Sequence, residues 1–272
     1  LRSAMHSARA EAEAAFGDAS VYLEKFLEHA RHVEVQILGD KHGNVVHLFE
    51  RDCTMQRRHQ KLIEEAPCPV IEEQTRDQLC RAAVRLCKAA DYYGAATVEF
   101  LLEPETQKFY LLEVNTRVQV EHPVTEMITD VDIVKAMFRI AAGEPLPFKQ
   151  SQIKRRGHAI ECRINAEDPE KGFAPRPGLI ERFLPPGGLG IRLDTHAHAG
   201  YRIPPHYDSM IGKLIAHGVD REEARRRMHR ALGEFIIDPI PTTIGLHRQL
   251  LNDSHFVSNR TDIHFVERLL ES

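Results

Sequence analysis

The chain has 272 residues, with 36 Lys plus Arg against 40 Asp plus Glu, for a net charge of −4. This length suits one to two domains with a sizeable core. The slightly acidic balance argues against a broad basic surface that would bind a polyanion, so we expect no nucleic-acid partner. The apolar runs are much shorter than the ~20 residues that cross a bilayer, so we expect no membrane span. The five cysteines form no CxxC pair, which favours a reducing, cytoplasmic setting without disulfides or zinc.

Hydrophobic periodicity gives the elements of the first half. In chain order we expect a helix at 1–16, strands near 21–24, at 31–38 and at 45–50, an ordered loop at 51–67, and a helix at 72–93. In the last helix, Leu79, Ala83, Leu86 and Ala90 share one face, and Gly94 is expected to stop it.

The second half continues as mixed helix and strand. We expect strands at 96–102, 108–114 and 158–166, and helices at 130–142 and 220–234. The last helix begins with Asp220 and has Glu223 three residues later, which is a capping-box pattern. The Pro-, Lys- and Arg-containing stretch 144–157 is a plausible boundary. The sequence therefore predicts an α+β fold in two units.

Residues 113–121 carry the densest set of polar side chains in the chain. Every odd position is polar, and three of the four even positions are Val. In an extended segment such alternation places the odd residues on one face, which suggests a site for small anions and a metal ion. The solvated face of an edge strand is an equally weighted alternative.

A neighbouring hairpin strengthens the metal interpretation. The five residues 103–107 suit a short connection between the strands on either side, and a hairpin centred on Thr106 places Glu99 opposite Glu113. Like charges directly opposite across strands are destabilising, and a divalent cation would remove that cost. Asn115 lies on the same face, and Mg²⁺ prefers such oxygen ligands. The alternative is two carboxylates that point into water.

Residues 51–61 form a local basic cluster in this acidic chain. Arg57, Arg58, His59 and Lys61 lie close together, with Gln56 beside them. Guanidinium and ammonium groups suit phosphate and carboxylate. A solvated charged loop is an equally weighted alternative.

Several long motifs resemble the biotin carboxylase family of the ATP-grasp superfamily. They are YLEKFLEHARHVEVQIL (22–38), RDCTMQRRHQKLIEEAP (51–67), EFLL (99–102), LEVNTRVQVEHPVTEMITDVD (112–132), GHAIECRINAEDP (157–169) and YDSMIGKL (207–214). The resemblance implies an ATP-grasp core followed by a biotin carboxylase C-terminal domain. We expect a remnant of the lid subdomain at 1–26, the core at 27–150, and the C-terminal domain at 157–268.

The resemblance also implies a role for each matching residue. Those implied for ATP are Glu24, Lys25, Leu27, His32, Gln56, His59 and Leu101. Those implied for Mg²⁺ or Mn²⁺ are Glu99, Glu113 and Asn115. Bicarbonate would be held by Lys61, Arg117, Gln119 and the backbone at Val120, with Arg163 facing biotin and Glu121 as general base. Of these, Glu121, Arg117, Arg163 and Lys61 are the implied catalytic residues.

The implied activity is ATP-dependent carboxylation of biotin with bicarbonate through carboxyphosphate. This is the first half-reaction of acetyl-CoA carboxylase in fatty-acid synthesis, with biotin carboxyl carrier protein and carboxyltransferase subunits as partners. The family also implies a homodimer through the C-terminal domain. Arg192 matches an interface position, whereas Leu189 replaces the usual aromatic residue.

The front of the chain departs from the family pattern. Residues 1–20 contain only Gly17 and no glycine-rich run, whereas the family has a glycine-rich lid loop and an N-terminal domain. We therefore expect a C-terminal fragment of a longer enzyme, ending at HFVERLLES as the stand-alone subunits do. Two alternatives stay open: a non-catalytic fragment that dimerises or binds a partner, and another ATP-grasp ligase that forms carboxyphosphate.

Overall fold

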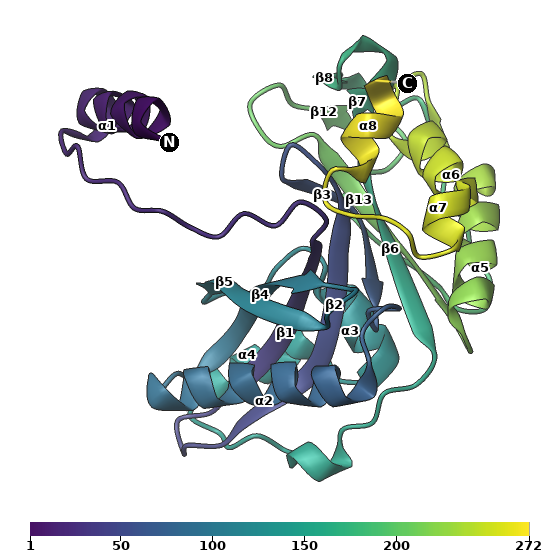
Figure 1. The fold of residues 1–272 in the computed structure, drawn as a ribbon. Coiled ribbons are helices and arrows are strands. Elements are labelled where there is room, and N and C mark those ends of the chain that lie inside the picture. The colour runs from purple at the N-terminus through teal and green to yellow at the C-terminus, as the bar shows by residue number, and fades with distance from the viewer. Residues whose placement is uncertain (272) are drawn as a thin grey trace.

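The computed structural model describes residues 1–271 and is organised around one eight-stranded sheet (Figure 1). The strand order is β11-β13-β6-β3-β2-β1-β4-β5, and each neighbouring pair is antiparallel. The strands are β1 (Arg31–Gly39), β2 (Val45–Arg57), β3 (Gln60–Ala66), β4 (Gly94–Glu103), β5 (Lys108–Asn115), β6 (His158–Asn165), β11 (Ile191–Thr195) and β13 (Met210–Gly218). Because β3 pairs with β6, the sheet runs without a break across the 144–157 connection.

Helices cover both faces of this sheet and one end of it (Figure 1). They are α2 (Glu73–Ala89), α3 (His122–Thr129), α4 (Ile133–Ala141), α5 (Arg221–Glu234), α6 (Ile244–Asn252), α7 (Ser254–Val257) and α8 (Phe265–Glu271). Three two-stranded ribbons pair β10 (Arg182–Leu184) with β14 (Ile236–Asp238), β12 (Arg202–Ile203) with β9 (Gly178–Leu179), and β7 (Glu167–Asp168) with β8 (Ala174–Pro175). The mixed α+β class is confirmed. Among residues 1–271, no helix combines the length and apolarity that a membrane span needs.

Strand β1 shows how alternation divides the sheet into an apolar face and a polar face. Val33, Val35 and Ile37 pack in one buried cluster with residues of α2. The intervening Glu34 and Gln36 are also fully buried, but they point to the opposite face, because successive side chains on a strand alternate. The first face supplies a hydrophobic core. On the second face, Glu34 and Gln36 belong to a polar site, whereas Leu38 packs with buried residues of α4.

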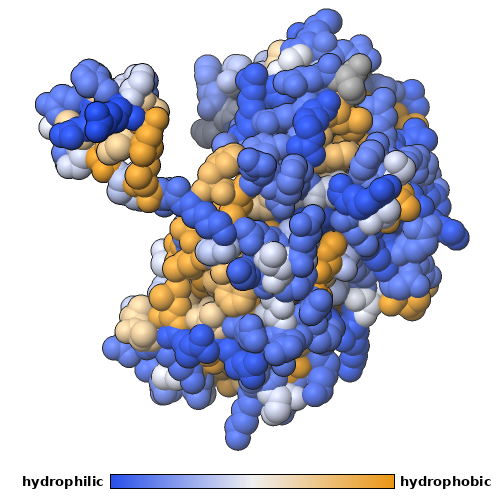
Figure 2. All heavy atoms as spheres, in the orientation of Figure 1, coloured by the Kyte–Doolittle hydropathy of each residue, from blue (hydrophilic) through white to orange (hydrophobic). Residues whose placement is uncertain are grey.

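The helix α1 (Arg2–Phe16) stands apart from the rest of the structure (Figure 1), and none of its residues is buried. The strand expected near 21–24 is wrong, because that segment has no regular structure and no strand partner among residues 1–271. Figure 2 shows apolar atoms gathered on the side of the body that faces α1. The exposed large apolar residues of the first 26 residues are Leu1, Phe16, Tyr22, Leu23 and Phe26, and those of β5 are Leu111, Leu112 and Val114.

The loop expected at 51–67 is also wrong. Strand β2 continues to Arg57 and turns directly into β3, with Arg58 and His59 at positive φ values of 47° and 63°. The segment looked like a loop because it is so highly charged. Arg51 and Asp52 are in fact buried, and each pairs with a charge on β1, so a polar sequence here forms the middle of the sheet.

The boundaries of two helices differ from the expected ones. Helix α2 ends at Ala89, and Gly94 instead begins β4. Leu79 and Ala83 are buried as expected, but Leu86 is exposed, since the buried face also includes Cys80 and Cys87. The helix expected at 130–142 begins at Ile133, where the Asp132 side chain accepts a hydrogen bond from the Lys135 N–H and caps it.

The polar stripe at 113–121 is extended only in its first part. Strand β5 ends at Asn115, and Glu121 is the N-cap residue of α3. The expected start of α5 is confirmed, because the Asp220 side chain accepts from the Glu223 N–H. In a full capping box the Glu223 side chain would accept from the Asp220 N–H. Here Glu223 Oε2 instead accepts from the N–H of the preceding residue, Val219, at 2.6 Å.

Replacing Ile160 with Ala tests the continuity of the sheet. Ile160 is fully buried in β6, between β3 and β13. We expect Ile160→Ala to lower the free energy of unfolding by about 2–5 kcal/mol, the usual cost of truncating a buried aliphatic side chain. Denaturant titration measures this, with Val219→Ala as the control, since Val219 is 80% exposed. A loss in Ile160→Ala no larger than in the control would contradict this role of β6.

Candidate active site

A cavity of about 810 Å³ opens on the polar face of the sheet. Its lining includes His32, Gln56, His59, Lys61, Glu99, Leu101, Glu113, Asn115, Arg117, Gln119, Val120, Glu121 and Arg163. All of the residues expected for bicarbonate, biotin and metal therefore surround one space, together with four of those expected for ATP. The structure also adds Asn165, Glu167, Asp208, Met210 and Ile263 to the lining.

The remaining three expected ATP residues lie in the segment before β1 and do not line this cavity. Lys25 Nζ donates to Tyr110 Oη at 2.6 Å and to Glu103 Oε1 at 3.0 Å, so it fastens the segment to β5 and β4. Leu27 is buried, and Glu24 is exposed.

Four charged side chains form a row straight across the sheet. Strand pairing places Arg51 opposite Glu34, Glu34 opposite Glu99, and Glu99 opposite Glu113. The hairpin prediction that Glu99 faces Glu113 is therefore confirmed. Three adjacent carboxylates repel one another, so positive charge has to be supplied from nearby.

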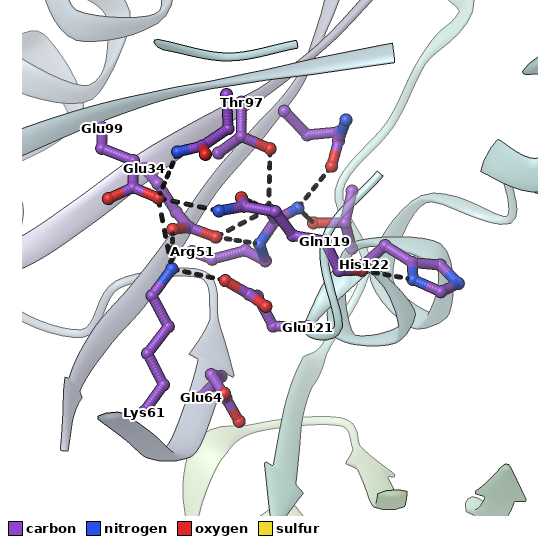
Figure 3. Close-up of polar contacts among 12 residues, drawn as sticks. Glu34, Arg51, Lys61, Glu64, Thr97, Glu99, Gln119, Glu121 and His122 are labelled. Atoms are coloured by element: carbon purple, nitrogen blue, oxygen red, sulfur yellow. Dashed lines mark hydrogen bonds and ion pairs between the residues drawn. The ribbon is translucent and has the colours of Figure 1, made fainter. Parts of the chain in front are cut away.

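Lys61 supplies one such charge (Figure 3). Its Nζ lies 2.6 Å from Glu34 Oε2, 2.5 Å from Glu121 Oε1 and 3.4 Å from Glu99 Oε1. Burial opposes the positive charge on Lys61, but these carboxylates and buried Cys53 together raise its pKa above the usual value. The ammonium therefore stays charged and draws three carboxylates to one point.

Arg51 supplies the second charge and is fully buried. A guanidinium has five N–H donors, and here all five have acceptors. The acceptors are Glu34 Oε1 (2.7 Å), Gln36 Oε1 (2.7 Å), Thr125 Oγ1 (3.1 Å), Thr97 Oγ1 (3.2 Å) and Gln119 Oε1 (3.5 Å). With its oxygen held by Arg51, Gln119 donates through Nε2 to Glu99 Oε1 at 2.8 Å, which fixes the orientation of its amide (Figure 3).

Glu34 and Glu99 stay ionised despite their burial. Burial alone would raise the pKa of Glu34, but the charges of Arg51 and Lys61 outweigh it and lower that pKa to about 2. Burial likewise opposes ionisation of Glu99. There the hydrogen bond from His32, at 2.7 Å, and the charge of Lys61 lower the pKa to about 2.

The Glu99–Glu113 end of the row has the donor set for a hard cation. Asn115 Nδ2 donates to Glu99 Oε1 at 3.0 Å and to Glu113 Oε1 at 2.8 Å, so three oxygen-bearing side chains converge at the cavity wall. Asn115 Oδ1 now accepts from Arg117 Nη2 at 3.3 Å, and it would have to turn to become a ligand. Carboxylate and amide oxygens fit Mg²⁺.

Glu121 lies where the two halves of the sheet meet. Besides Lys61, it contacts Arg163, whose Nη2 donates to Glu121 Oε2 at 3.0 Å. Arg163 Nε donates to Glu64 Oε1 at 2.5 Å, and Lys213 Nζ donates to the Val120 carbonyl at 2.9 Å. A carboxylate between a lysine and an arginine is thus held at the cavity surface.

Sequence reasoning missed Glu34, Arg51, Glu64 and Lys213. One signal was present, because 31–38 carries polar residues at 32, 34 and 36, on the same face of a strand. Arg51 and Glu64 sit in the segment 51–67, whose charge suggested exposure, whereas Lys213 lies in the largely apolar β13. The partners of all three are distant in sequence.

Two family models match most of the chain. The model for "Carbamoyl-phosphate synthase L chain, ATP binding domain" matches residues 1–149, and that for "Biotin carboxylase C-terminal domain" matches residues 161–268. The residues between the two matches, 150–160, lie in the connection between α4 and β6 and at the start of β6.

Individual relatives agree with these matches. The chain is 55% identical to biotin carboxylase of Haemophilus influenzae over 270 residues, which is 99% of this chain and 60% of that protein. A Campylobacter jejuni biotin carboxylase–β,γ-ATP complex superposes with a TM-score of 0.91 at 46% identity, covering 98% of this chain and 59% of that one. The biotin carboxylase domain of Hydrogenobacter thermophilus 2-oxoglutarate carboxylase, in complex with MgADP, ADP and bicarbonate, gives a TM-score of 0.91 at 47% identity, covering 98% of this chain and 58% of that one.

The chain thus spans about 60% of the length of a curated relative that it matches along nearly its whole length. Its fold is an ATP-grasp-type domain followed by a biotin carboxylase C-terminal domain. On these matches, the chain belongs to the biotin carboxylase family of the ATP-grasp superfamily.

Proposed function

We propose that this chain carries the metal, bicarbonate and biotin sites of an ATP-dependent biotin carboxylase. The observation that carries the proposal is the position of Glu121. Its two oxygens meet Lys61 and Arg163 at the wall of a cavity that also contains the Glu99–Glu113 pair. A base, two cations and a cation-binding carboxylate pair on one surface are what carboxyphosphate chemistry needs.

The nucleotide would enter between the Glu99–Glu113 end and the strand turn at 58–59. Leu101 and His32, which pair across β4 and β1, line the cavity beside Glu99, and Gln56 and His59 line it near the turn between β2 and β3. Glu24, Lys25 and Leu27 stay proposed adenine contacts in the segment before β1. Glu99, Glu113 and Asn115 would hold Mg²⁺ or Mn²⁺, which when bound neutralises charge on the phosphate oxygens.

Bicarbonate would be held by Lys61, Arg117, Gln119 and the Val120 N–H, replacing one of the cation contacts of Glu121. Glu121 then accepts the bicarbonate proton as general base. The deprotonated bicarbonate oxygen attacks the γ-phosphorus of ATP. The bond between the γ-phosphorus and the ADP oxygen breaks, so carboxyphosphate and ADP form. Because Arg51 fixes Gln119 and Glu34 fixes Lys61 before substrate arrives, little reorganisation remains.

Carboxyphosphate would then divide into CO₂ and phosphate, and phosphate would take the proton from the ureido nitrogen of biotin. That nitrogen attacks CO₂ to give carboxybiotin. Arg163 would stabilise the negative charge on the ureido oxygen. Its guanidinium, held at Nε by Glu64, projects Nη2 toward Glu121.

The partners follow from the same proposal. Biotin would arrive on biotin carboxyl carrier protein, and carboxyltransferase subunits would complete acetyl-CoA carboxylase for fatty-acid synthesis in the cytoplasm. We also propose a homodimer through the C-terminal domain. Leu189 is 82% exposed there, and Arg192 is paired with Glu126 and Asp194.

The general-base role predicts the effect of Glu121→Gln. This change keeps the shape of the side chain but removes its basicity, so ADP release that depends on bicarbonate and biotin should fall by at least about 100-fold. Nucleotide binding should be largely retained. Glu105→Gln, an exposed change outside the cavity, is the control and should keep the parent rate. Equal turnover by Glu121→Gln and the parent would exclude the role.

The metal site predicts the effect of Glu113→Gln. With one carboxylate oxygen replaced by an amide, the Mg²⁺ concentration for half-maximal ADP release should rise by at least about tenfold. Titrating Mg²⁺ at fixed ATP measures it. Glu105→Gln, an exposed change in the loop of the same hairpin, should not shift the curve. An unchanged Mg²⁺ requirement in Glu113→Gln would remove Glu113 from the proposed ligand set.

A further inference from the structure

Two buried carboxyl groups beneath the cavity have no part in the chemistry described so far. Glu64 on β3 lies directly opposite Glu161 on β6, and both are fully buried. Neither oxygen of Glu161 has a hydrogen-bond partner, and Glu64 Oε2 also lacks one. A buried ionised carboxylate without partners is very unfavourable, and like charges directly opposite add to that cost. The two groups therefore cannot both be ionised.

The surrounding charges show which of the two keeps its negative charge. Glu161 is influenced by Glu64 from β3, Lys213 from β13, Arg163 from its own strand, and Glu121 at the start of α3. Of the two carboxyl groups, only Glu64 receives a direct bond, from Arg163 Nε at 2.5 Å. Lys213 Nζ is engaged by the Val120 carbonyl instead. The charge thus belongs on Glu64 and the proton on Glu161.

The electrostatics of the two groups agree with this assignment. Burial, and then the negative charge of Glu64, raise the pKa of Glu161 well above its usual value. Burial also raises the pKa of Glu64, although the nearby Arg163 opposes that shift. Both shifts favour a proton on the pair, and the stronger shift, at Glu161, agrees with its lack of hydrogen-bond partners.

We propose that Glu64 and Glu161 together hold one proton and form the positioning pair for Arg163. Ionised Glu64 fixes the guanidinium through Nε, and protonated Glu161 adds no second negative charge that would pull the guanidinium back into the sheet. Nη2 is thereby left facing Glu121 at 3.0 Å (Figure 3 shows Glu64 beside Glu121). The catalytic meaning of this arrangement rests on the proposed function, but the protonation and the placement of Arg163 do not.

Infrared spectroscopy of the intact chain tests the protonation without any turnover. At neutral pH we expect a C=O stretch of a protonated carboxyl group, which should disappear in Glu161→Gln. Glu65→Gln is the matched control. Glu65 neighbours Glu64 on β3 and is equally buried in the sheet, but it is bonded by His158 and Arg221, which lower its pKa despite burial. The Glu65→Gln variant should therefore keep the C=O band of the protonated carboxyl group. No such band in the parent, or a band that survives Glu161→Gln, would overturn the proposal.

The pH dependence of stability gives a second check. Because the pKa of Glu161 is raised in the folded chain, the stability contributed by its proton is fully present below the usual pKa of a glutamate. It is lost as pH rises from there through the raised value. Glu161→Gln should remove this loss, and an identical loss in the parent and the variant would contradict the assignment.

Nitrogen-15 NMR of the arginine side chains tests the positioning itself. The Nε–H resonance of Arg163, assigned by its absence in Arg163→Lys, should stay in place in Glu161→Gln and shift in Glu64→Gln, which removes the charged acceptor. A general loss of packing in a variant would shift the resonances of other arginine side chains as well as that of Arg163. If Glu161→Gln moved the Arg163 resonance as far as Glu64→Gln does, the division of roles would be wrong. If Glu64→Gln does not fold, a displaced Arg163 Nε–H resonance in Glu161→Gln would by itself contradict the proposal.

Discussion

A row of like charges across one sheet, two of them buried, is the constraint on which the rest of this structure depends. Glu34, Glu99 and Glu113 lie side by side on β1, β4 and β5, and Glu34 and Glu99 are buried. Desolvating each such ion costs several kcal/mol, and removing one partner of a buried pair typically costs about 3–5 kcal/mol. Arg51 and Lys61 therefore stabilise the folded sheet, and the same contacts assemble the site.

The two faces of the sheet divide stability from chemistry. Val33 and Val35 pack with α2, whereas His32 and Glu34, one residue away in each case, face the charged network or the cavity. A one-residue slip of β1 would exchange these faces, so the apolar core also fixes the register of the site. The pairing of β3 with β6 then brings Arg163 from the second half of the chain to Glu121 in the first.

Local sequence information predicted the parts of the site that are close in sequence. The pairing of Glu99 with Glu113 was predicted from alternation and a short connection, and it was correct. The hairpin itself is not centred on Thr106, because Glu103 pairs with Lys108, and a register shift between Glu99 and Phe100 brings Glu99 opposite Glu113. The charged segment 51–67 was read as a loop because polarity usually indicates solvent. Its burial depends on partners that periodicity does not reveal, such as Glu34, 17 residues before Arg51. Arg163 and Glu64 are separated by 99 residues, and only the folded sheet brings them together.

Titration calorimetry of Mg²⁺-ATP into the intact chain, with and without bicarbonate, tests the central claim most directly. The claim is that folding alone prepares the cavity around Glu99, Glu113 and Lys61 for a metal nucleotide and bicarbonate. It predicts saturable heat that requires Mg²⁺ and changes when bicarbonate is present. No heat up to millimolar nucleotide would contradict the claim and favour a chain that serves only to dimerise or to bind a partner.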